Sequence, residues 1–327
     1  MDEWLLRNLV CPIDRTPLTR EQDTIWCESR HAYPVVEGVA VLLTPDADPT
    51  HPYLSESLEA AARWRRGEPL GWEEDLPDAG GGIDRWVQQE IGNTCGNLYW
   101  GLLDQLPRYP IPELRLPAGE GKHLLDVGCN WGRWTIAASR AGYTSVGIDP
   151  SLRALLAAKR VAHQLDAPAQ FIVADARHLP FADDCLDVVF SYSVLQHFAR
   201  EAAEAALEEM ARVLGPAGSC LVQMANRYGI WQLYGQLRQW RRPQGLFAVR
   251  RYSPGELVEM FERRVGPARL DVDGFFTLNA QPADLDLLPG RYRLVVRASE
   301  ALRKLSATLP GLRRVADSLY IHARPRS

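Results

Sequence analysis

The strongest constraint on the fold is a regular alternation of apolar runs and helix-length segments that begins near residue 122. Two of the intervening segments, "LRALLAAKRVAHQL" and "EAAEAALEEMARVL", carry apolar residues at i, i+3, i+4 and i+7, which is typical of helices with one buried face. Continuous apolar strands joined by helices form parallel sheets that are covered on both faces. The alternation therefore predicts an α/β protein with a doubly wound, mostly parallel sheet, whose strands include 123–128, 145–149, 170–174, 186–190 and 219–224.

The whole chain divides into four zones. Residues 1–45 contain short β-like runs between polar turns and are expected to form a small β-rich module. Residues 46–120 mix helix-like stretches with dense proline and glycine, which indicates a helical linker or lid ahead of the core at 121–225. Residues 226–327 are expected to form a substrate cap and to complete the sheet, with helices at 230–242 and 254–264 and strands at 269–277 and 318–324.

Composition and charge limit location and partners. The 327 residues contain neither a charged and apolar leader nor a run of about 18 apolar residues, so we expect a cytoplasmic protein without a membrane span. The six cysteines are scattered and are expected to be reduced thiols. The net charge of −4 divides into −13 for residues 1–226 and +9 for residues 227–327, where 18 Lys and Arg stand against 9 Asp and Glu. The spread of these arginines favours a solvated surface over an anion-binding cluster.

The segment "HLLDVGCNWGRW" at 123–134 places a glycine-containing loop between a strand and the next helix. Such a loop presents backbone N–H groups and a helix N-terminus to a ligand. Its pattern, D-x-G-x-x-x-G from Asp126 to Gly132, lacks the glycine spacing of a dinucleotide site, which argues against NAD or FAD. Asn130 stands where a middle glycine is usual. Because asparagine tolerates positive φ better than other non-glycine residues, we expect it to make the turn.

Three segments in this order, "LLDVGCNWGRW", "SVGIDPS" and "FIVADARHLPFADDCLDVVFSYSVLQHF", resemble the class I S-adenosylmethionine-dependent methyltransferases. The resemblance covers about residues 122–225 and departs from the family's D/E-x-G-x-G-x-G loop at Asn130. It implies a Rossmann-like sheet of seven strands, S-adenosylmethionine as the cofactor and methyl transfer as the reaction. A sulfonium cofactor requires no phosphate cradle, so a loop with fewer glycines is sufficient.

The cofactor contacts are expected at the ends of the strands. Asp149 can accept both ribose hydroxyls, and a role as helix N-cap is compatible with this contact. Asp175 is expected to accept from the adenine amino group while the N–H of Ala176 donates to the ring; a simple turn is the alternative for Asp175. Asp126 and Ser191 are expected at the methionyl end of the pocket. The loop completes the set with Gly128, Cys129, Asn130 and Gly132.

His197 in "SYSVLQHF" comes shortly after the strand expected at 186–190, on the rim of the sheet where ligands bind. Methylation of a hydroxyl requires loss of its proton, so His197 is the first candidate for a general base. A structural histidine beside the cofactor is an equally good interpretation of the same residue. Tyr192, Gln196 and His178 are weaker candidates for the base.

The N-terminal segment resembles the small zinc ribbon that precedes some bacterial methyltransferases, and the short activator proteins of tRNA methyltransferases. Cys11, Cys27 and His31 match the pattern, while Asp14 replaces its second cysteine. A carboxylate can bind zinc, so these four residues form a candidate zinc site that is weaker than one with a further thiolate. The alternative is a relic ribbon that keeps its strands without a metal.

These features favour a methyltransferase that acts on an oxygen of a small-molecule acceptor or of a glycan- or lipid-linked acceptor. An RNA base methyltransferase is the first alternative, because zinc ribbons precede some of those enzymes and residues 234–252 interleave basic and aromatic side chains. A binding protein with this fold but no turnover is the second, although a silent fold has no need to keep Asp126, Gly128, Asp149 and Asp175.

The RNA alternative is weakened by the pattern of the same basic segment. Ile230, Leu233, Tyr234 and Leu237 form one apolar stripe of an amphipathic helix. The cationic patch that is left suits one phosphate or carboxylate better than a long RNA; it consists of Arg241, Arg242, Arg250 and Arg251.

Overall fold

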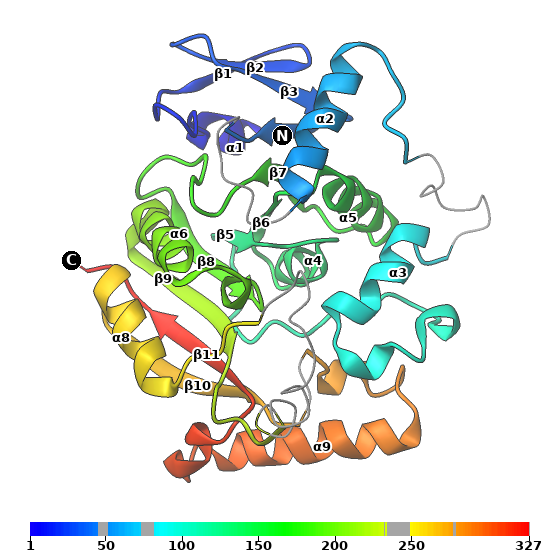
Figure 1. Cartoon of the computed structure of the whole chain (residues 1–327), viewed down its shortest axis with the longest axis vertical. Coiled ribbons are helices and arrows are strands. Elements are labelled where there is room, and N and C mark those ends of the chain that lie inside the picture. Colours follow the sequence, from blue (N-terminus) through cyan, green and yellow to red (C-terminus); the bar gives the residue numbers. More distant parts are fainter. Residues whose placement is uncertain (45–51, 73–81, 232, 234–248, 277–278, 327) are drawn as a thin grey trace.

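The computed structural model describes residues 1–44, 52–72, 82–231, 233, 249–276 and 279–326 (Figure 1). One sheet of eleven strands crosses the molecule in the order β1-β2-β3-β4-β7-β6-β5-β8-β9-β11-β10. Seven of these strands form the predicted core: β5 (His123–Val127), β6 (Thr144–Asp149), β7 (Gln170–Ala174), β8 (Leu186–Tyr192), β9 (Leu214–Ala225), β10 (Ala268–Gly274) and β11 (Ser318–Ala323). All seven overlap the strands expected from the sequence.

The core sheet is doubly wound. β5 pairs in parallel with both β6 and β8, so the chain winds first towards one edge of the sheet and then towards the other. β9 continues in parallel beside β8, whereas β11 runs antiparallel to β9 and β10. The predicted α/β class and mostly parallel seven-stranded core are confirmed. Ligands of such sheets bind outside the carboxyl ends of the strands where the winding direction reverses.

Four N-terminal strands extend this sheet beyond β7. They are β1 (Leu18–Glu21), β2 (Thr24–Cys27), β3 (Ala32–Val36) and β4 (Val39–Leu42), and each is antiparallel to the next. β4 pairs in parallel with β7, with Val41 opposite Val173, and both of these side chains are buried. The β-rich segment expected at residues 1–45 thus shares backbone hydrogen bonds with the core. As a consequence, β4 covers an edge of the core sheet that would otherwise be open.

Helices cover both faces of the sheet. Alternate residues of β7 point to opposite faces, so Ile172 and Phe171 belong to different apolar cores. Leu5, Met210 and Phe261 fill the first core; they come from α1 (Glu3–Asn8), α6 (Arg200–Val213) and α8 (Pro254–Arg264). The second core is packed by α2 (Tyr53–Arg65), α3 (Arg85–Thr94) and α5 (Leu152–Gln164). α4 (Arg133–Arg140) begins directly after the loop that follows β5.

The C-terminal zone agrees with the sequence in part. The helix expected at 254–264 is found as α8, whereas most of the one expected at 230–242 lies outside the described residues. α9 (Gly290–Leu305) was not expected, because its buried residues are only Val296 and Ser299 and its remaining apolar residues do not form a buried stripe. Short 3₁₀ segments complete the described part: η2 (Asn97–Tyr99), η3 (Leu103–Gln105), η4 (Leu195–His197), η5 (Pro282–Asp284) and η6 (Pro310–Arg314). Within the described ranges, each helix is too short or too polar to cross a membrane.

Candidate functional site

A cavity of about 400 Å³ lies at the carboxyl ends of the central strands. Loops that follow β5, β6, β7 and β8 supply much of its wall, including Gly128, Cys129, Asn130, Asp149, Asp175, Ala176 and His197. Helices α2 and α3 add Tyr53, Leu54, Glu90, Asn93 and Thr94, so the zone expected as a lid does contribute to the wall. The volume is within the range of pockets that hold small ligands.

The loop after β5 depends on three residues with positive φ. The φ angles are 76° at Gly128, 47° at Asn130 and 78° at Gly132. The Oδ1 atom of Asn130 accepts a hydrogen bond of 2.7 Å from the N–H of Trp131, which helps to hold the left-handed conformation expected for this asparagine. A Cβ atom at Gly128 would come within 2.4 Å of the Val194 side chain, so the close approach also requires glycine there.

Gly132 has a different role from the expected cofactor contact. It lies outside the cavity wall, at the N-cap of α4. A Cβ atom at this position would come within 2.8 Å of the Phe171 ring and 3.1 Å of the Ala158 side chain. The missing side chain therefore allows α4 to begin close to β7 and α5.

Asp149 ends β6 and faces the cavity. Its Oδ2 atom accepts the N–H of Asn130 and its Oδ1 atom accepts the N–H of Ser151, each over 3.0 Å. The N-cap of α5 is Ser151, whose hydroxyl accepts the N–H of Ala154. Burial raises the pKa of the Asp149 carboxyl to about 6. One carboxylate thus joins two loops at the cavity wall.

Asp126 lies beneath the cavity and does not line it. The side chain is buried and its Oδ2 atom accepts a hydrogen bond of 2.7 Å from the Thr135 hydroxyl on α4. Burial, with the charge of Asp149 as a further cause, raises the pKa of Asp126 to about 7. The expected role in orienting the loop agrees with this bond to α4. The expected contact of Asp126 with the methionyl end of the cofactor does not agree with the structure, because the carboxylate points into the protein and away from the cavity.

Asp175 and Ala176 both lie on the cavity wall, as expected. The Asp175 carboxylate already binds the guanidinium of Arg177, which donates from Nη2 over 2.5 Å and from Nε over 3.0 Å. The backbone N–H of Arg177 donates to the same carboxylate over 2.9 Å. Arg177 also lines the cavity and was not singled out in the sequence. A ligand at Asp175 would therefore meet an ion pair rather than an isolated acid.

Ser191 does not reach the cavity, which corrects the sequence prediction. Its side chain is fully buried and its hydroxyl donates to the carbonyl oxygen of Val127 over 2.9 Å. β8 continues through Tyr192, so Ser191 lies within the strand rather than at its end. Ser193, two residues later, is the serine on the cavity wall.

α3 is tied to the loop after β5 through Thr94. The indole N–H of Trp131 donates to the Thr94 hydroxyl over 2.8 Å, and Nη1 of Arg133 donates to the Thr94 carbonyl oxygen over 3.1 Å. Asn279, which also lines the cavity, donates to the same carbonyl oxygen over 2.9 Å. The tryptophan in the loop therefore anchors the helix that covers the site.

Arg133 is a functional candidate that the sequence did not reveal. It lines the cavity although its overall exposure is only 2%. Its Nε and Nη2 atoms have no hydrogen-bond partner among the described residues. A buried guanidinium is costly unless anionic groups compensate its charge; the buried Asp284 carboxylate does so in part, and the unused donors leave room for a further anionic group. Its place after the last loop glycine was visible in "NWGRW", but only the fold turns the side chain into the cavity.

His197 lines the cavity from η4, as expected for a residue on the rim of the sheet. The weaker candidates are less suitable as bases. Tyr192 lines the cavity, but its hydroxyl donates to Asp273 over 2.5 Å and its pKa is raised well above the ordinary value by burial. Gln196 uses both ends of its amide, towards Ser193 and the N–H of Ala225. His178 is exposed and away from the wall.

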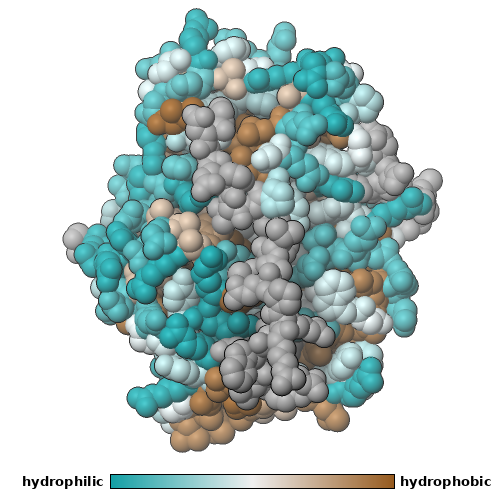
Figure 2. Space-filling view, in the orientation of Figure 1, coloured by the Kyte–Doolittle hydropathy of each residue, from teal (hydrophilic) through white to brown (hydrophobic). Residues whose placement is uncertain are grey.

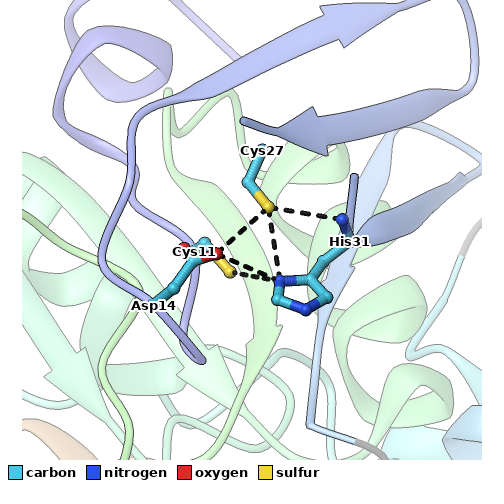
Figure 3. Close-up of side chains that lie close together, drawn as sticks. All are labelled: Cys11, Asp14, Cys27 and His31. Atoms are coloured by element: carbon cyan, nitrogen blue, oxygen red, sulfur yellow. Dashed lines mark hydrogen bonds and ion pairs between the residues drawn. The ribbon is translucent and has the colours of Figure 1, made fainter. Parts of the chain in front are cut away.

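The four predicted metal ligands meet in the N-terminal segment (Figure 3). Cys11, Asp14, Cys27 and His31 place one ligand atom each within 4.8 Å of all the others. His31 Nδ1 lies 3.4 Å from the sulfur of Cys11, 3.3 Å from that of Cys27 and 3.3 Å from Oδ2 of Asp14. Tetrahedral zinc with ordinary bond lengths places such ligand atoms roughly 3.3–3.8 Å apart. The four residues therefore fit a zinc ion.

Side chains around this cluster were not anticipated. The Tyr33 hydroxyl lies 3.1 Å from the Cys11 sulfur, and the backbone N–H of His31 donates to the Cys27 sulfur over 3.3 Å. Asp14 accepts the hydroxyl of Thr16 over 2.7 Å, and this bond is the main cause that holds the Asp14 pKa well below its usual range. Burial raises the pKa of the Cys11 thiol. These contacts orient the ligand atoms towards one another.

A family model described as a methyltransferase domain matches residues 125–222, which contain the loop, Asp149, Asp175 and His197. The chain carries a class I methyltransferase domain. The methyltransferase domain expected from the motifs is confirmed for these residues.

Two relatives indicate how far the similarity to this methyltransferase domain extends. Methyltransferase GfsG of Streptomyces halstedii is 37% identical over 109 residues, which are 32% of this chain and 38% of that protein. The ubiquinone biosynthesis O-methyltransferase of Rhizobium rhizogenes is 32% identical over 108 residues, 33% of this chain and 43% of the relative. The chain thus spans about two fifths of the length of these relatives.

One solved structure with partial likeness is phosphoethanolamine N-methyltransferase 2 of Haemonchus contortus in complex with S-adenosyl-L-methionine. Its TM-score is 0.43 at 20% identity, over 64% of this chain and 50% of that one.

Proposed function

We propose that this chain transfers the methyl group of S-adenosylmethionine to a hydroxyl oxygen of a small-molecule acceptor, or of a glycan- or lipid-linked acceptor whose reactive end enters the cavity. The observation that carries the proposal is the presence of His197 on the same cavity wall as Asp149 and Asp175. The similarity to an enzyme named as an O-methyltransferase supports oxygen as the methylated atom.

The charges on the cavity wall suit this donor. S-adenosylmethionine, when bound, supplies a methyl group that is activated by the positive charge on sulfur. Asp149 and Glu90 offer carboxylates to ribose hydroxyls and to positive charge. Asp175 and the N–H of Ala176 offer the adenine contacts expected from the sequence. Arg133, whose buried Nε and Nη2 atoms are unused among the described residues, offers a binding group for the methionyl carboxylate.

The chain contributes orientation and a base. Holding donor and acceptor in line can supply roughly 7–11 kcal/mol of the acceleration in favourable cases. His197 accepts the proton that the acceptor hydroxyl loses as its oxygen bonds to carbon. The hydrogen bonds from Trp131 and Arg133 to Thr94 keep α3 against the site, so that water is held away from the reacting groups.

An RNA acceptor is disfavoured by the same wall. Glu90 and Asp149 bring carboxylates to the cavity, and these would repel a chain of phosphates, whereas Asp175 is already paired with Arg177. Of the proposed cationic patch, Arg250 donates to the carbonyl oxygen of His197 over 2.8 Å, and Arg251 is partly buried. Arg241 and Arg242 lie outside the described residues.

Product analysis tests the proposal. The full chain is incubated with S-adenosylmethionine that carries an isotopically labelled methyl group, and with separate pools of hydroxylated metabolites, amines, lipid-linked glycans and total RNA. Mass spectrometry is expected to find the label on an oxygen in a hydroxylated pool and none above background in RNA. Label in RNA, bound at submicromolar concentration near physiological salt, would instead support the RNA alternative.

A further inference from the structure

We propose that α9 and the segment after it form a docking surface for an anionic lipid bilayer. The surface consists of Leu294, Ala298, Ala301 and Leu305 on α9, together with Leu309 and Val315, and we call it the α9 surface. Figure 2 shows apolar residues along the lower edge of the molecule, where Figure 1 places α9. The proposal concerns binding to a surface and is independent of which acceptor is methylated.

The face of α9 that points to solvent is apolar, whereas in most surface helices the apolar face points to the core. Val296 and Ser299 face inward, where the Ser299 hydroxyl accepts the N–H of Phe275 over 2.9 Å. Residues 294, 298, 301 and 305 follow one another at intervals of four and three residues, so they share one face of the helix. Leu294 is 67% exposed and Leu305 45%. The helix therefore presents a leucine and alanine stripe to solvent.

The stripe continues after the helix ends. Leu309 is 52% exposed and Val315 is 37% exposed. The N–H of Ile230 donates to the carbonyl oxygen of Val315 over 3.2 Å, so the backbone of two further exposed residues, Ile230 and Trp231, runs beside Val315. Large apolar side chains that gather on one exposed edge mark an interaction surface, whereas scattered ones do not.

The charges around the stripe identify the occupant. Residues 290–316 contain seven Lys and Arg against one acidic residue, Glu300. That acid is largely covered, and it is paired with Arg303 over 2.6 Å. Exposed basic side chains flank the stripe: Arg291, Arg293, Arg297, Lys304 and Arg314. An apolar stripe between cations is the pattern of a helix that lies in the interface of an anionic membrane.

A second copy of the chain fits this surface less well. Two copies that met through the α9 surface would bring two mostly cationic borders together, because residues 290–316 contain seven Lys and Arg and only one acid. Like charges opposed across an interface disfavour association. Phosphate headgroups above an apolar layer instead match both the cations and the leucines.

Vesicle co-sedimentation of the full chain tests the proposal. The probes are vesicles of phosphatidylglycerol and phosphatidylcholine in about equal amounts, and vesicles of phosphatidylcholine alone. One variant combines Arg291→Gln, Arg297→Gln and Lys304→Gln, and a second combines Leu294→Ser, Leu305→Ser and Leu309→Ser. The matched control replaces three exposed arginines elsewhere, Arg7→Gln, Arg263→Gln and Arg269→Gln, and so has the net charge of the first variant.

The unchanged chain is expected to bind anionic vesicles at low salt and to bind neutral vesicles at least about 10-fold more weakly. Each α9 variant should lose about 10-fold or more in affinity for anionic vesicles, while the matched control keeps most of it. Thermal melting of every variant verifies that it is folded. Failure to bind anionic vesicles, equal binding to neutral ones, or equal losses in control and α9 variants would overturn the proposal. Dimerisation in ultracentrifugation that the leucine variant abolishes would assign the surface to a second copy.

Discussion

The backbone N–H of Asn130 donates a hydrogen bond to Oδ2 of Asp149 over 3.0 Å, so the loop after β5 is fastened by the residue that ends β6. The positive φ of Asn130 turns the chain directly after this N–H, towards Trp131 and the start of α4. Asp149 consequently has two functions that experiments must separate: it holds the loop, and it presents a carboxylate to the cavity.

Asp149→Ala is expected to weaken binding of S-adenosylmethionine or its demethylated product by roughly 1.5–3 kcal/mol, because charge-assisted hydrogen bonds to the ribose are lost. Isothermal titration calorimetry measures the affinity. Asp149→Asn keeps one oxygen acceptor and should lose less. Melting curves of both variants separate loss of the loop from loss of the ligand contact. Unchanged affinity in a folded Asp149→Ala protein would remove this residue from cofactor binding.

Arg133→Met is expected to weaken binding of S-adenosylhomocysteine by about 10-fold or more, since a carboxylate would lose a buried guanidinium partner. Binding of methylthioadenosine, which has no carboxylate, should change much less. Arg140→Met, at the exposed C-terminal end of α4, is the matched control and should leave both affinities unchanged. Equal losses for the two ligands would contradict a carboxylate contact.

His197→Gln is expected to slow methyl transfer to a hydroxyl acceptor by about 10²-fold or more, which is the usual contribution of a general base. Affinity for the cofactor should change little. His178→Gln provides the matched control, because His178 is exposed and lies off the cavity wall. Single-turnover rates across pH measure the effect. Undiminished transfer in His197→Gln would leave this residue with a structural role.

Asp126 should make the stability of the ligand-free protein depend on pH. Its pKa is about 7 in the folded protein against an ordinary value of 3.8, so the unfolded chain ionises first as pH rises. The free energy of unfolding is therefore expected to fall between about pH 4 and pH 7, by an amount on the order of 4 kcal/mol from this group. Asp149, with a pKa of about 6, adds to the decline in the same range.

Urea unfolding of Asp126→Asn at several pH values measures the contribution of Asp126. The variant should show a flatter profile than the unchanged chain, because its amide has no charge to bury. A decline of the same size in both proteins would assign the pH dependence to other groups.

Purified, untagged protein is expected to contain about one zinc ion per chain, held by Cys11, Asp14, Cys27 and His31. Asp14→Cys should slow loss of zinc to a chelator, because thiolate is the softer ligand. Cys185→Ser, which changes a cysteine outside the cluster, should leave zinc content unaltered. Metal analysis that finds no zinc in the fresh protein would favour the relic ribbon.

The candidate site could be predicted where it depends on residues close in sequence. The loop after β5, Asp149, Asp175 with Ala176, and His197 all reach the cavity wall. Ser191 does not, because β8 continues to Tyr192, two residues beyond the apolar run at 186–190. Asp126 and Gly132 belong to the same motif as the lining residues, but they support α4 from below. A motif identifies the loop, whereas the direction of each side chain depends on the backbone path.

The sequence alone determined the alternation of strands and helices through its apolar periodicity, and the left-handed turn at Asn130 through local backbone preference. Its resemblance to a zinc ribbon identified the four donors of the metal cluster. Only the tertiary structure decided that β4 joins the sheet at β7, that Thr94 fastens α3 over the site, that Arg133 enters the cavity and that α9 turns leucines outward. Each of these joins segments far apart in the chain. The contacts between such distant segments depend on how whole surfaces pack together, and the periodicity of one segment does not identify the segment against which it packs.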